Sequence, residues 1–316
     1  MPLSFIYFLL ISIRIWAYKT GILKSTKINV PVVVVGNITI GGTGKTPAVL
    51  WLLKKLVKFG MKPGLISRGY NSNASSPQEV FIDSLVSDVG DEALMIKSRF
   101  QKNNVPVFVG KRRAKVAKSL LNYYPDVNIL ISDDGLQHYE LERDFEIVVV
   151  DGDRGYGNNF LMPAGPLREP ISRVNTVDAV VLNGLPTKQL HEKNIISYQM
   201  KSRGDLLVNC LHENRISDPN ALEKDIIAVT GIGNPQRFKD HLSGLNIHLN
   251  KMIIFDDHHS FTKADFNDYD NVDVIMTEKD AVKCKDFAKE NFWYLPIFSS
   301  VDEKLFKKIL EKLRLN

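Results

Sequence analysis

A run of four valines at residues 32–35 leads into a glycine-rich turn that ends in Gly44-Lys45-Thr46. In phosphate-binding loops an apolar strand enters such a turn, and successive backbone N–H groups of the turn point at a bound polyphosphate. The lysine of the loop reaches the β- and γ-phosphates, and the hydroxyl of the next residue coordinates magnesium. The segment therefore predicts an α/β fold that binds a nucleoside triphosphate.

The predicted loop departs from the general pattern at its first position. That pattern begins with glycine, and here Thr39 stands in its place. A flexible glycine turn between a strand and a helix, with no ligand, is the competing interpretation. The residues predicted to contact the nucleotide are Thr39, Ile40, Gly41, Gly42, Thr43, Gly44, Lys45 and Thr46.

The composition is that of a globular protein with a buried core. Of 316 residues, 44% are hydrophobic and 24% are charged, close to the average for folded domains. The net charge of +5 suits phosphorylated substrates or anionic lipid, or reflects solubility alone. No basic stripe is interleaved with aromatic residues, so we expect no nucleic-acid partner. Cys210 and Cys284 are the only cysteines, which argues against a disulfide framework and for a reducing compartment.

The first residues form a separate apolar segment. The run at residues 3–13 is shorter than the roughly 20 residues of a membrane-spanning helix, and no charged segment or cleavage site marks a signal peptide. The residues that follow are of types that favour a membrane–water interface. They are Arg14, Trp16, Tyr18, Lys19 and Lys24. The segment predicts a helix that lies in or dips into a membrane face, with a buried core helix as the alternative.

Apolar strands alternate with helices along the rest of the chain, which predicts a parallel sheet with helices on both faces. The expected strands lie at 62–70, 105–109, 127–131, 146–150, 177–182, 226–230 and 273–276, and the expected helices at 47–58, 91–100, 112–121, 236–242 and 303–313. The pattern restarts near Gly184. We therefore expect a membrane-associating helix at 1–25, a phosphate-loop core at 26–184 and a smaller α/β lobe at 185–316, one continuous sheet being the alternative.

Two acidic segments are candidates for metal or proton chemistry. Asp133 and Asp134 follow the apolar run at 129–131, at the carboxyl edge of the expected sheet, where ligands bind. We expect Asp133 to hold magnesium, with Asp134 as the second choice, while capping of the next turn is the alternative. Asp91 and Glu92 lie at a helix start, where carboxylates also stabilise the helix dipole.

A second group of candidates is basic or histidine-containing. His258 follows two aspartates and could relay a proton, although a surface loop or a metal pair with His259 fits the same residues. Arg113 and Arg168 lie in loops where guanidinium groups would suit phosphate. The segment 277–280 could hold a phosphate or close the lobe interface.

These segments occur together and in order along nearly the whole chain. They are 36–47, Ser67-Arg68-Gly69-Tyr70, Val89-Gly90-Asp91-Glu92, Asp133-Asp134-Gly135-Leu136-Gln137-His138, 163–169, Asp257-His258 and Thr277-Glu278-Lys279-Asp280. The set, with the apolar N-terminal segment, resembles the tetraacyldisaccharide 4′-kinase (LpxK) family of lipid A biosynthesis. One departure is Ala93, where the family often has proline.

The resemblance implies ATP-dependent phosphorylation of the 4′-hydroxyl of a tetraacylated glucosamine disaccharide 1-phosphate, giving lipid IVA at the cytoplasmic face of the bacterial inner membrane. It implies that Asp91 and His258 act on the attacking hydroxyl and that Lys45 stabilises the transferred phosphoryl group. Magnesium would be held by Thr46 and Asp133, with Glu92 and Asp134 nearby. Arg113 and Arg168 fall in motifs that the family uses around nucleotide or substrate phosphate.

A membrane-recruited switch ATPase is the alternative function, because such proteins share the loop and often a membrane helix. They carry a second lysine just before the glycine pair, where this chain has Ile40. They also provide no reason for Asp257-His258 in a separate lobe.

Overall fold

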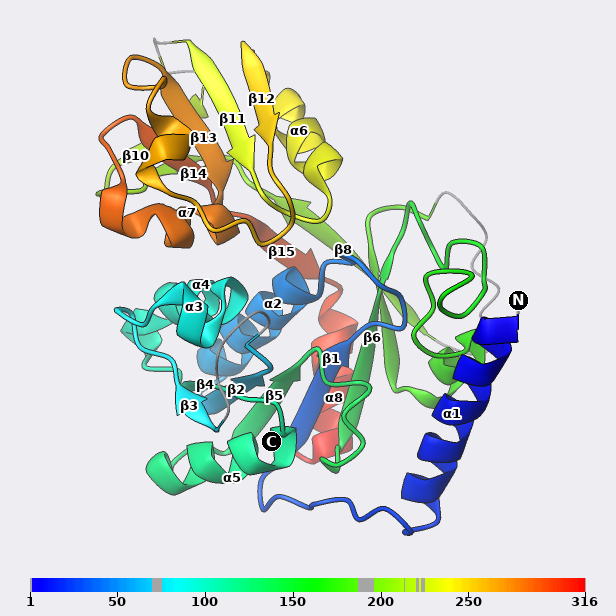
Figure 1. Cartoon of the computed structure of the whole chain (residues 1–316). Coiled ribbons are helices and arrows are strands. Elements are labelled where there is room, and N and C mark those ends of the chain that lie inside the picture. Colours follow the sequence, from blue (N-terminus) through cyan, green and yellow to red (C-terminus); the bar gives the residue numbers. More distant parts are fainter. Residues whose placement is uncertain are drawn as a thin grey trace.

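The large sheet carries the predicted phosphate loop. The computed structural model describes residues 2–69, 76–186, 196–212, 214–219, 222 and 225–315. Nine strands pair in the order β15-β8-β7-β6-β1-β5-β2-β4-β3, all parallel except the two edge strands (Figure 1). Their bounds are β1 Val32–Gly36, β2 Pro63–Ser67, β3 Gln78–Glu79, β4 Val107–Val109, β5 Ile129–Asp133, β6 Phe145–Asp151, β7 Ala179–Asn183, β8 Ser197–Arg203 and β15 Phe298–Val301.

Helices cover both faces of this sheet, as the alternating pattern predicts. Val33 and Val35 of β1 face a core formed with α2 (Lys45–Lys58), α4 (Asp91–Arg99) and α8 (Glu303–Leu313). Val32 and Val34 face the opposite core, which includes α5 (Arg113–Tyr123). Because successive side chains of a strand point to opposite faces, the four valines serve both cores and place β1 inside the sheet.

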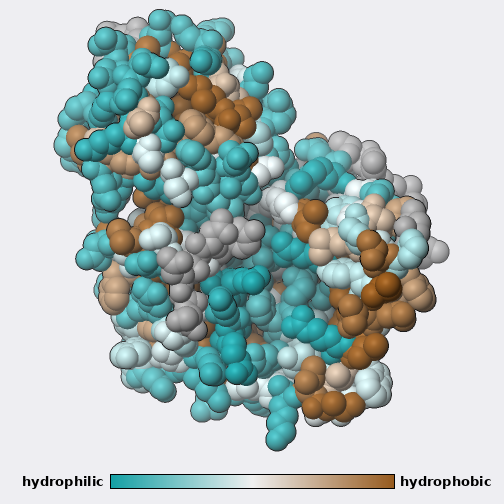
Figure 2. All heavy atoms as spheres, viewed as in Figure 1, coloured by the Kyte–Doolittle hydropathy of each residue, from teal (hydrophilic) through white to brown (hydrophobic). Residues whose placement is uncertain are grey.

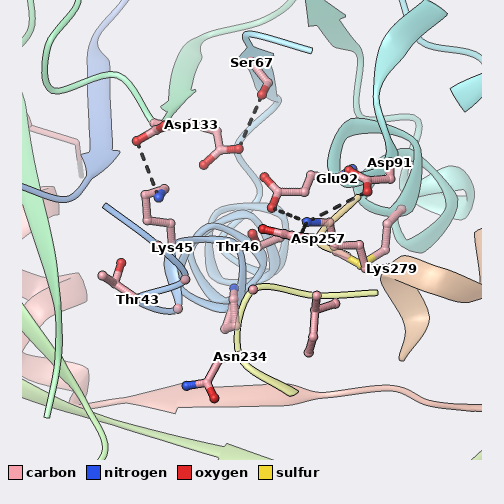
Figure 3. A pocket seen from close by; sticks show the side chains of 18 of the residues that line it. Thr43, Lys45, Thr46, Ser67, Asp91, Glu92, Asp133, Asn234, Asp257 and Lys279 are labelled. Carbon is pink, nitrogen blue, oxygen red and sulfur yellow. Dashed lines mark hydrogen bonds and ion pairs between the residues drawn. The ribbon is translucent and has the colours of Figure 1, made fainter. Parts of the chain in front are cut away.

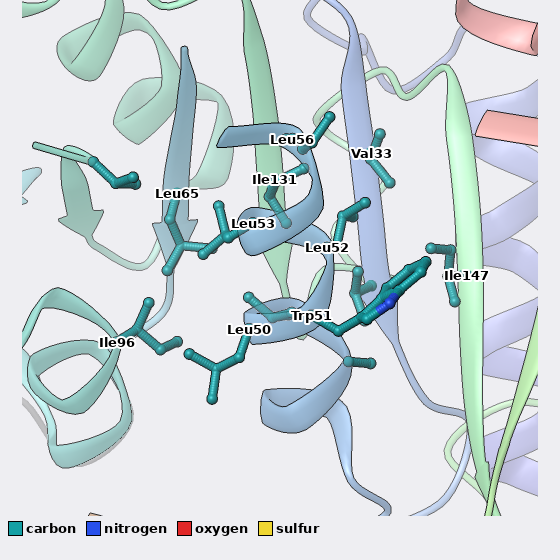
Figure 4. Packing of buried hydrophobic residues seen from close by; sticks show 14 of the residues in the cluster. Val33, Leu50, Trp51, Leu52, Leu53, Leu56, Leu65, Ile96, Ile131 and Ile147 are labelled. Atoms are coloured by element: carbon teal, nitrogen blue, oxygen red, sulfur yellow. The ribbon is translucent and has the colours of Figure 1, made fainter. Parts of the chain in front are cut away.

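Helix α2 fixes the position of the loop that precedes it. Trp51, Leu52, Leu53 and Leu56 are buried against β1 and its neighbouring strands (Figure 4). Burial of each such side chain stabilises the fold by about 1.5–3 kcal/mol. The helix therefore holds its N-terminus, at Lys45, at the carboxyl edge of the sheet.

The smaller sheet has six strands in the order β10-β9-β14-β13-β11-β12, with β11 to β14 parallel. The bounds are β9 Leu207–Asn209, β10 Ile216–Ser217, β11 Ile226–Thr230, β12 Lys251–Ile254, β13 Asp273–Thr277 and β14 Phe292–Leu295. Helix α6 (Pro235–Gly244) packs on one face and α7 (Glu278–Cys284) on the other. Cys210 and Cys284 are both free thiols.

The two sheets do not divide the chain at residue 184, so the expected boundary needs a correction. Strand β8 pairs with β7, and β15 near the end of the chain pairs with β8. Helix α8 then packs under the large sheet. Residues 185–316 therefore contribute to both lobes, and the smaller lobe is inserted between two strands of the larger one. The sequence analysis assigned no strand to the residues of β8 and β15, since both strands are short or half exposed.

Helix α1 (Pro2–Lys19) lies along the outside of the large lobe (Figure 1). It is longer than the apolar run at 3–13, and by length and composition it could cross a membrane, with almost none of it buried. Three contacts attach it. The Ala164 N–H donates to Ser4 Oγ (3.1 Å), the Tyr7 hydroxyl donates to the Arg168 carbonyl (3.2 Å), and Tyr18 packs on Tyr139. Its exposed large apolar side chains form a stripe on the surface (Figure 2).

Candidate active site

A cavity of about 800 Å³ lies between the two lobes. The loop before α2, the start of α4 and the end of β5 form its wall on the large lobe. Segments of the smaller lobe around Asn234, His258 and Lys279 close it from the other side (Figure 3). The cavity therefore collects side chains from every motif that the sequence analysis singled out.

The glycine loop before α2, whose residues 41–46 line the cavity, has the backbone conformation of a phosphate-binding loop. Gly41 and Gly44 have φ values of 87° and 95°, in the left-handed region that favours glycine. A Cβ on Gly44 would lie 2.2 Å from Asn183 Nδ2, which donates to the Thr43 carbonyl. Asn183 is the last residue of β7 and lies at the same edge of the sheet. It was not among the predicted site residues, although a polar residue directly after an apolar strand is typical of this edge.

The two residues at the start of the loop lie away from the cavity. Thr39 pairs with Leu167 in an isolated bridge, and the Ile40 N–H donates to the Pro166 carbonyl (2.8 Å). The lining residues of the loop run from Gly41 to Thr46. Thr39 does not have positive φ, which explains why glycine is not required there. We therefore correct the prediction for Thr39 and Ile40, which support the loop from outside the cavity.

Lys45 lies within a chain of charges at the carboxyl edge of the sheet. Its Nζ is 3.6 Å from Asp134 Oδ1, and Arg168 Nη1 is 3.2 Å from Asp134 Oδ2. Burial would raise the pKa of Asp134, but Lys45 and Arg168 outweigh it and hold that pKa below its usual value. Arg168 therefore lies close to the loop, and its predicted contact with phosphate stays a prediction.

Asp133 is the most deeply buried carboxyl group in this region. Burial, with the charges of Glu92 and Asp134, raises the pKa of Asp133 to about 7. Ser67 Oγ donates to its Oδ2 (3.4 Å), while Oδ1 has no hydrogen-bond partner among the described residues. An unpaired buried oxygen is costly. A cation at this edge would satisfy it, and the cation would also favour the ionised carboxylate.

The residues present fit a magnesium ion that arrives with a nucleotide. Thr46 also lines the cavity, and oxygen is the ligand atom that Mg²⁺ prefers. Within the described ranges no group of three or more His, Cys, Asp or Glu side chains could hold a metal ion by itself.

Arg113 lies beneath the cavity, which corrects the prediction that it contacts a substrate phosphate. Its side chain is 1% exposed and donates to the carbonyls of Gly110 (3.0 Å) and Asp133 (2.9 Å). Burial lowers its pKa to about 10, so it remains a cation at neutral pH. The residue supports the end of β5 and has no surface open to a ligand.

Asp91 and His258 come together across the lobe interface. His258 Nδ1 lies 2.9 Å from Asp91 Oδ2, one group on the loop after β12 and the other on the first turn of α4. Burial would raise the pKa of Asp91, but the hydrogen bond from His258 and the charges of Lys279 and Lys283 lower it below its usual value. A carboxylate paired with imidazole in this way can accept a proton from a hydroxyl group.

The Glu92 carboxylate interacts with two neighbouring groups, Lys279 and Asp133. Its Oε1 lies 3.3 Å from Lys279 Nζ, and its charge helps to raise the pKa of Asp133 (Figure 3). The family resemblance implies that the Glu92 carboxylate lies near magnesium, whereas in this structure it forms an ion pair with Lys279.

The segment 277–280 closes the lobe interface, one of the two roles considered for it. Arg99 of α4 forms an ion pair with Glu278 of α7 and donates to the Ile297 carbonyl (2.7 Å). Lys279 beside it reaches three carboxylates and His258. The amino-acid sequence does not reveal that Lys279 lies with Asp91 and His258, because the contact depends on how the lobes pack.

Comparisons with known proteins agree along the whole chain. The family model described as tetraacyldisaccharide-1-P 4′-kinase matches residues 1–314. The tetraacyldisaccharide 4′-kinase of Methylobacillus flagellatus is 44% identical over 99% of this chain and 90% of its own length. That of Colwellia psychrerythraea is 45% identical over 96% and 90%. The crystal structure of "apo" form LpxK from Aquifex aeolicus in complex with ATP has a TM-score of 0.81 and 27% identity, covering 99% of this chain and 98% of that one.

Proposed function

The chain belongs to the tetraacyldisaccharide 4′-kinase family, and from this premise we propose that Asp91, His258 and Lys45 carry out its phosphoryl transfer. The enzyme transfers phosphate from ATP to the 4′-hydroxyl of a tetraacyldisaccharide 1-phosphate and so forms lipid IVA. The full-length family match leaves no support for a switch ATPase. The role of each residue is supported by the geometry of the cavity.

The triphosphate of ATP binds in the glycine loop at the floor of the cavity. The positive φ values of Gly41 and Gly44 and the N-terminus of α2 direct N–H groups toward this space. Lys45 exchanges its ion pair with Asp134 for the phosphoryl oxygens, whose charge it stabilises. The homologous Aquifex structure contains ATP, which supports this assignment.

Asp91 and His258 accept the proton of the sugar hydroxyl. The 2.9 Å contact between Nδ1 and the carboxylate orients the imidazole. The pair opens into the same cavity as the loop, so a hydroxyl group can lie between it and the γ-phosphate. The contact between Asp91 and His258 across the lobe interface is the main support for this assignment. A phosphate loop that only hydrolysed ATP would not need such a pair.

A magnesium ion that accompanies the nucleotide would be held by Thr46 and Asp133, with Asp134 nearby. The unpaired Oδ1 of Asp133 supports this assignment. When bound, the ion neutralises charge on the phosphates during transfer. Arg113 and Ser67 keep the Asp133 segment in place through its carbonyl and carboxylate oxygens.

Helix α1 brings the enzyme to its lipid substrate. Its exposed apolar stripe is long enough to enter a bilayer, and its Tyr7 and Arg14 also line the cavity. A substrate with four acyl chains stays in the membrane, so the catalytic cavity must lie close to the surface. We place the enzyme at the cytoplasmic face of the inner membrane, with 1–25 as the membrane segment and the two lobes outside the bilayer.

The test is a transfer assay with labelled ATP and a tetraacyldisaccharide 1-phosphate in mixed micelles. The bis-phosphorylated lipid should form with the wild type and fall sharply with Asp91→Asn and His258→Ala. Nucleotide binding, measured separately, should be retained in both variants. Full transfer by either folded variant would refute the assignment of the pair.

A further inference from the structure

Lys279 lies among four acid–base groups at the lobe interface. Its Nζ lies 3.3 Å from Glu92 Oε1, 3.7 Å from Asp257 Oδ1 and 3.8 Å from Asp91 Oδ2. The same atom is 3.4 Å from His258 Nε2. The lysine side chain is only 16% exposed. Burial alone would lower the pKa of Lys279, but these carboxylates raise it, so the group is a cation.

The contacts of His258 with Lys279 and with Asp91 favour the same ring nitrogen as the carrier of the proton. An ammonium group has donors only, so Nε2 must accept in this contact. The proton of the neutral imidazole then resides on Nδ1, where it is donated to Asp91 Oδ2 (2.9 Å). In this tautomer Asp91 orients the ring and Nε2 is the nitrogen that can take a proton from a substrate.

Lys279 can leave Nε2 without losing its charge partners. Glu92 and Asp257 lie on either side at 3.3 and 3.7 Å, so a small movement keeps the ammonium paired. The substrate hydroxyl can then take its place at Nε2. A phosphate that enters the cavity would favour this movement, because it adds negative charge on the side of the loop.

We propose that Lys279 is a positioning residue of the transfer reaction, which holds His258 in the tautomer with the proton on Nδ1 and yields Nε2 to the acceptor hydroxyl. The inference rests on the proposed function of Asp91 and His258. During transfer the hydroxyl proton moves to Nε2, the sugar oxygen bonds to the γ-phosphorus, and the bond to the β-phosphate oxygen breaks with its electron pair leaving on ADP. Lys279 neither gains nor loses a proton.

A purely structural role does not account for the position of this lysine. Arg99 and Glu278 already connect α4 to α7, and Lys283 lies between Asp280 (2.7 Å) and Asp91 (3.8 Å) one turn along α7. Lys279 instead directs its charge toward the cavity, which it lines. Its replacement should therefore leave the lobe interface assembled.

The experiment compares Lys279→Met and Lys279→Gln, which remove the charge, with Lys279→Arg, which keeps a donor-only cation. Lys285→Met is the matched control, because Lys285 is an exposed lysine just after α7. For the neutral variants we expect kcat to fall by roughly 10- to 100-fold, part of the range for acid–base catalysis, with KM for ATP within about twofold. Lys279→Arg should recover most of the lost kcat, and the control should match the wild type.

Three results would overturn the proposal. They are an unchanged kcat in the folded neutral variants, a raised KM for ATP with kcat unchanged, and no recovery in folded Lys279→Arg. The second would make Lys279 a nucleotide contact, and the third would show that its charge does not matter. Two neutral variants are measured so that, if one of them fails to fold, the other still tests the proposal.

A double-mutant cycle separates this inference from the function on which it rests. If Lys279 acts through the imidazole, Lys279→Met should cost almost nothing further in a His258→Ala background. A full additional loss there would overturn the inference. Full activity of either folded variant, His258→Ala or Asp91→Asn, would instead refute the proposed pair itself, whatever Lys279 does.

Discussion

His258 Nδ1 lies 2.9 Å from Asp91 Oδ2, although 167 positions separate the two residues in the chain. One belongs to the smaller lobe and the other to the first turn of α4 in the larger lobe. The proposed proton-accepting pair therefore exists only while the lobes are in contact. Neither half carries the proposed chemistry alone.

Removing either partner of this pair should slow the chemical step. We expect Asp91→Asn and His258→Ala each to reduce kcat by about 10²- to 10⁴-fold, with KM for ATP little changed, because the nucleotide lies on the loop. The double variant should lose little more than the worse single one, since the two groups act as a unit. Steady-state kinetics measures this.

A neighbouring histidine provides the control for that experiment. His259 stacks on Phe255 at 4.4 Å and lies 3.5 Å from Asp265, away from Asp91. His259→Gln should therefore keep kcat near the wild-type value. A loss as large as that of His258→Ala would show that the loop conformation, rather than the imidazole of His258, limits the rate.

Lys45→Ala should abolish measurable phosphoryl transfer. The ammonium group is the cation of the glycine loop, and we expect kcat to fall at least 10²-fold while the protein remains folded. The variant leaves Asp134 paired with Arg168, so the cavity keeps its shape. Lys58→Ala, an exposed lysine at the other end of α2, is the matched control. An active, folded Lys45→Ala would contradict the phosphate-loop assignment.

The apolar stripe of α1 should determine membrane binding. Phe5, Leu10 and Ile13 are 62%, 63% and 60% exposed, and none contributes one of the three contacts that attach the helix. Replacing all three with serine should reduce recovery with liposomes in a flotation assay at least tenfold, because each side chain loses about 1.5–3 kcal/mol of transfer energy. Equal flotation of variant and wild type would exclude α1 as the main anchor.

The specificity of this effect can be tested with apolar residues elsewhere on the surface. Phe81 and Leu85 are also exposed, at 52% and 60%, but lie before α4, away from α1. Their replacement with serine should leave flotation unchanged.

Arg99→Ala should destabilise the lobe interface. Arg99 and Glu278 are 15% and 11% exposed, so the variant leaves a largely buried carboxylate without its partner, at a cost of about 2–4 kcal/mol. Lys62→Ala removes an ion pair with Asp126 whose members are 63% and 80% exposed, and should cost less than about 1 kcal/mol. Urea denaturation compares the two, and equal losses would contradict the structural role of Arg99.

Stability should fall as the pH decreases below about 6.5, in part because of His138. Burial, with the charge of Arg113, lowers the pKa of His138 to about 3. The unfolded chain takes up this proton near pH 6.5 and the folded chain does not, so protons favour unfolding. Between pH 7 and 5 this amounts to about 2 kcal/mol. Denaturation of His138→Gln should show a shallower decline, and an identical slope would contradict the assignment.

Much of the fold follows from local sequence. Strands such as β1 and β11 are continuous apolar runs, and α8 was predicted at its observed bounds because its apolar residues recur at helical spacing. Strands β8 and β15 were missed, since each has a half-exposed pattern and depends on pairing with strands distant in the chain: β8 pairs with β7 and β15, and β15 pairs with β8. The order of strands in a sheet is a tertiary property that periodicity does not contain.

In the candidate site, too, some positions follow from local sequence and others depend on tertiary packing. Lys45, Thr46 and Asp133 lie at strand ends, so their positions follow from the parallel sheet alone. The prediction that Asp91 and His258 act together was based on the family resemblance. The contact of Lys279 with both residues was not predicted. These contacts depend on how two sheets pack against each other. Arg113 was misplaced because a basic loop does not reveal which guanidinium turns inward.

The insertion of the smaller lobe between β8 and β15 sets an order for biosynthesis. The strands of the smaller sheet, β9 to β14, leave the ribosome before β15 and α8, which complete the larger one. The lobe that begins earlier in the chain is therefore the last to be finished. During translation the nascent enzyme has its glycine loop and its apolar helix α1 long before the sheet that supports the loop has its final edge.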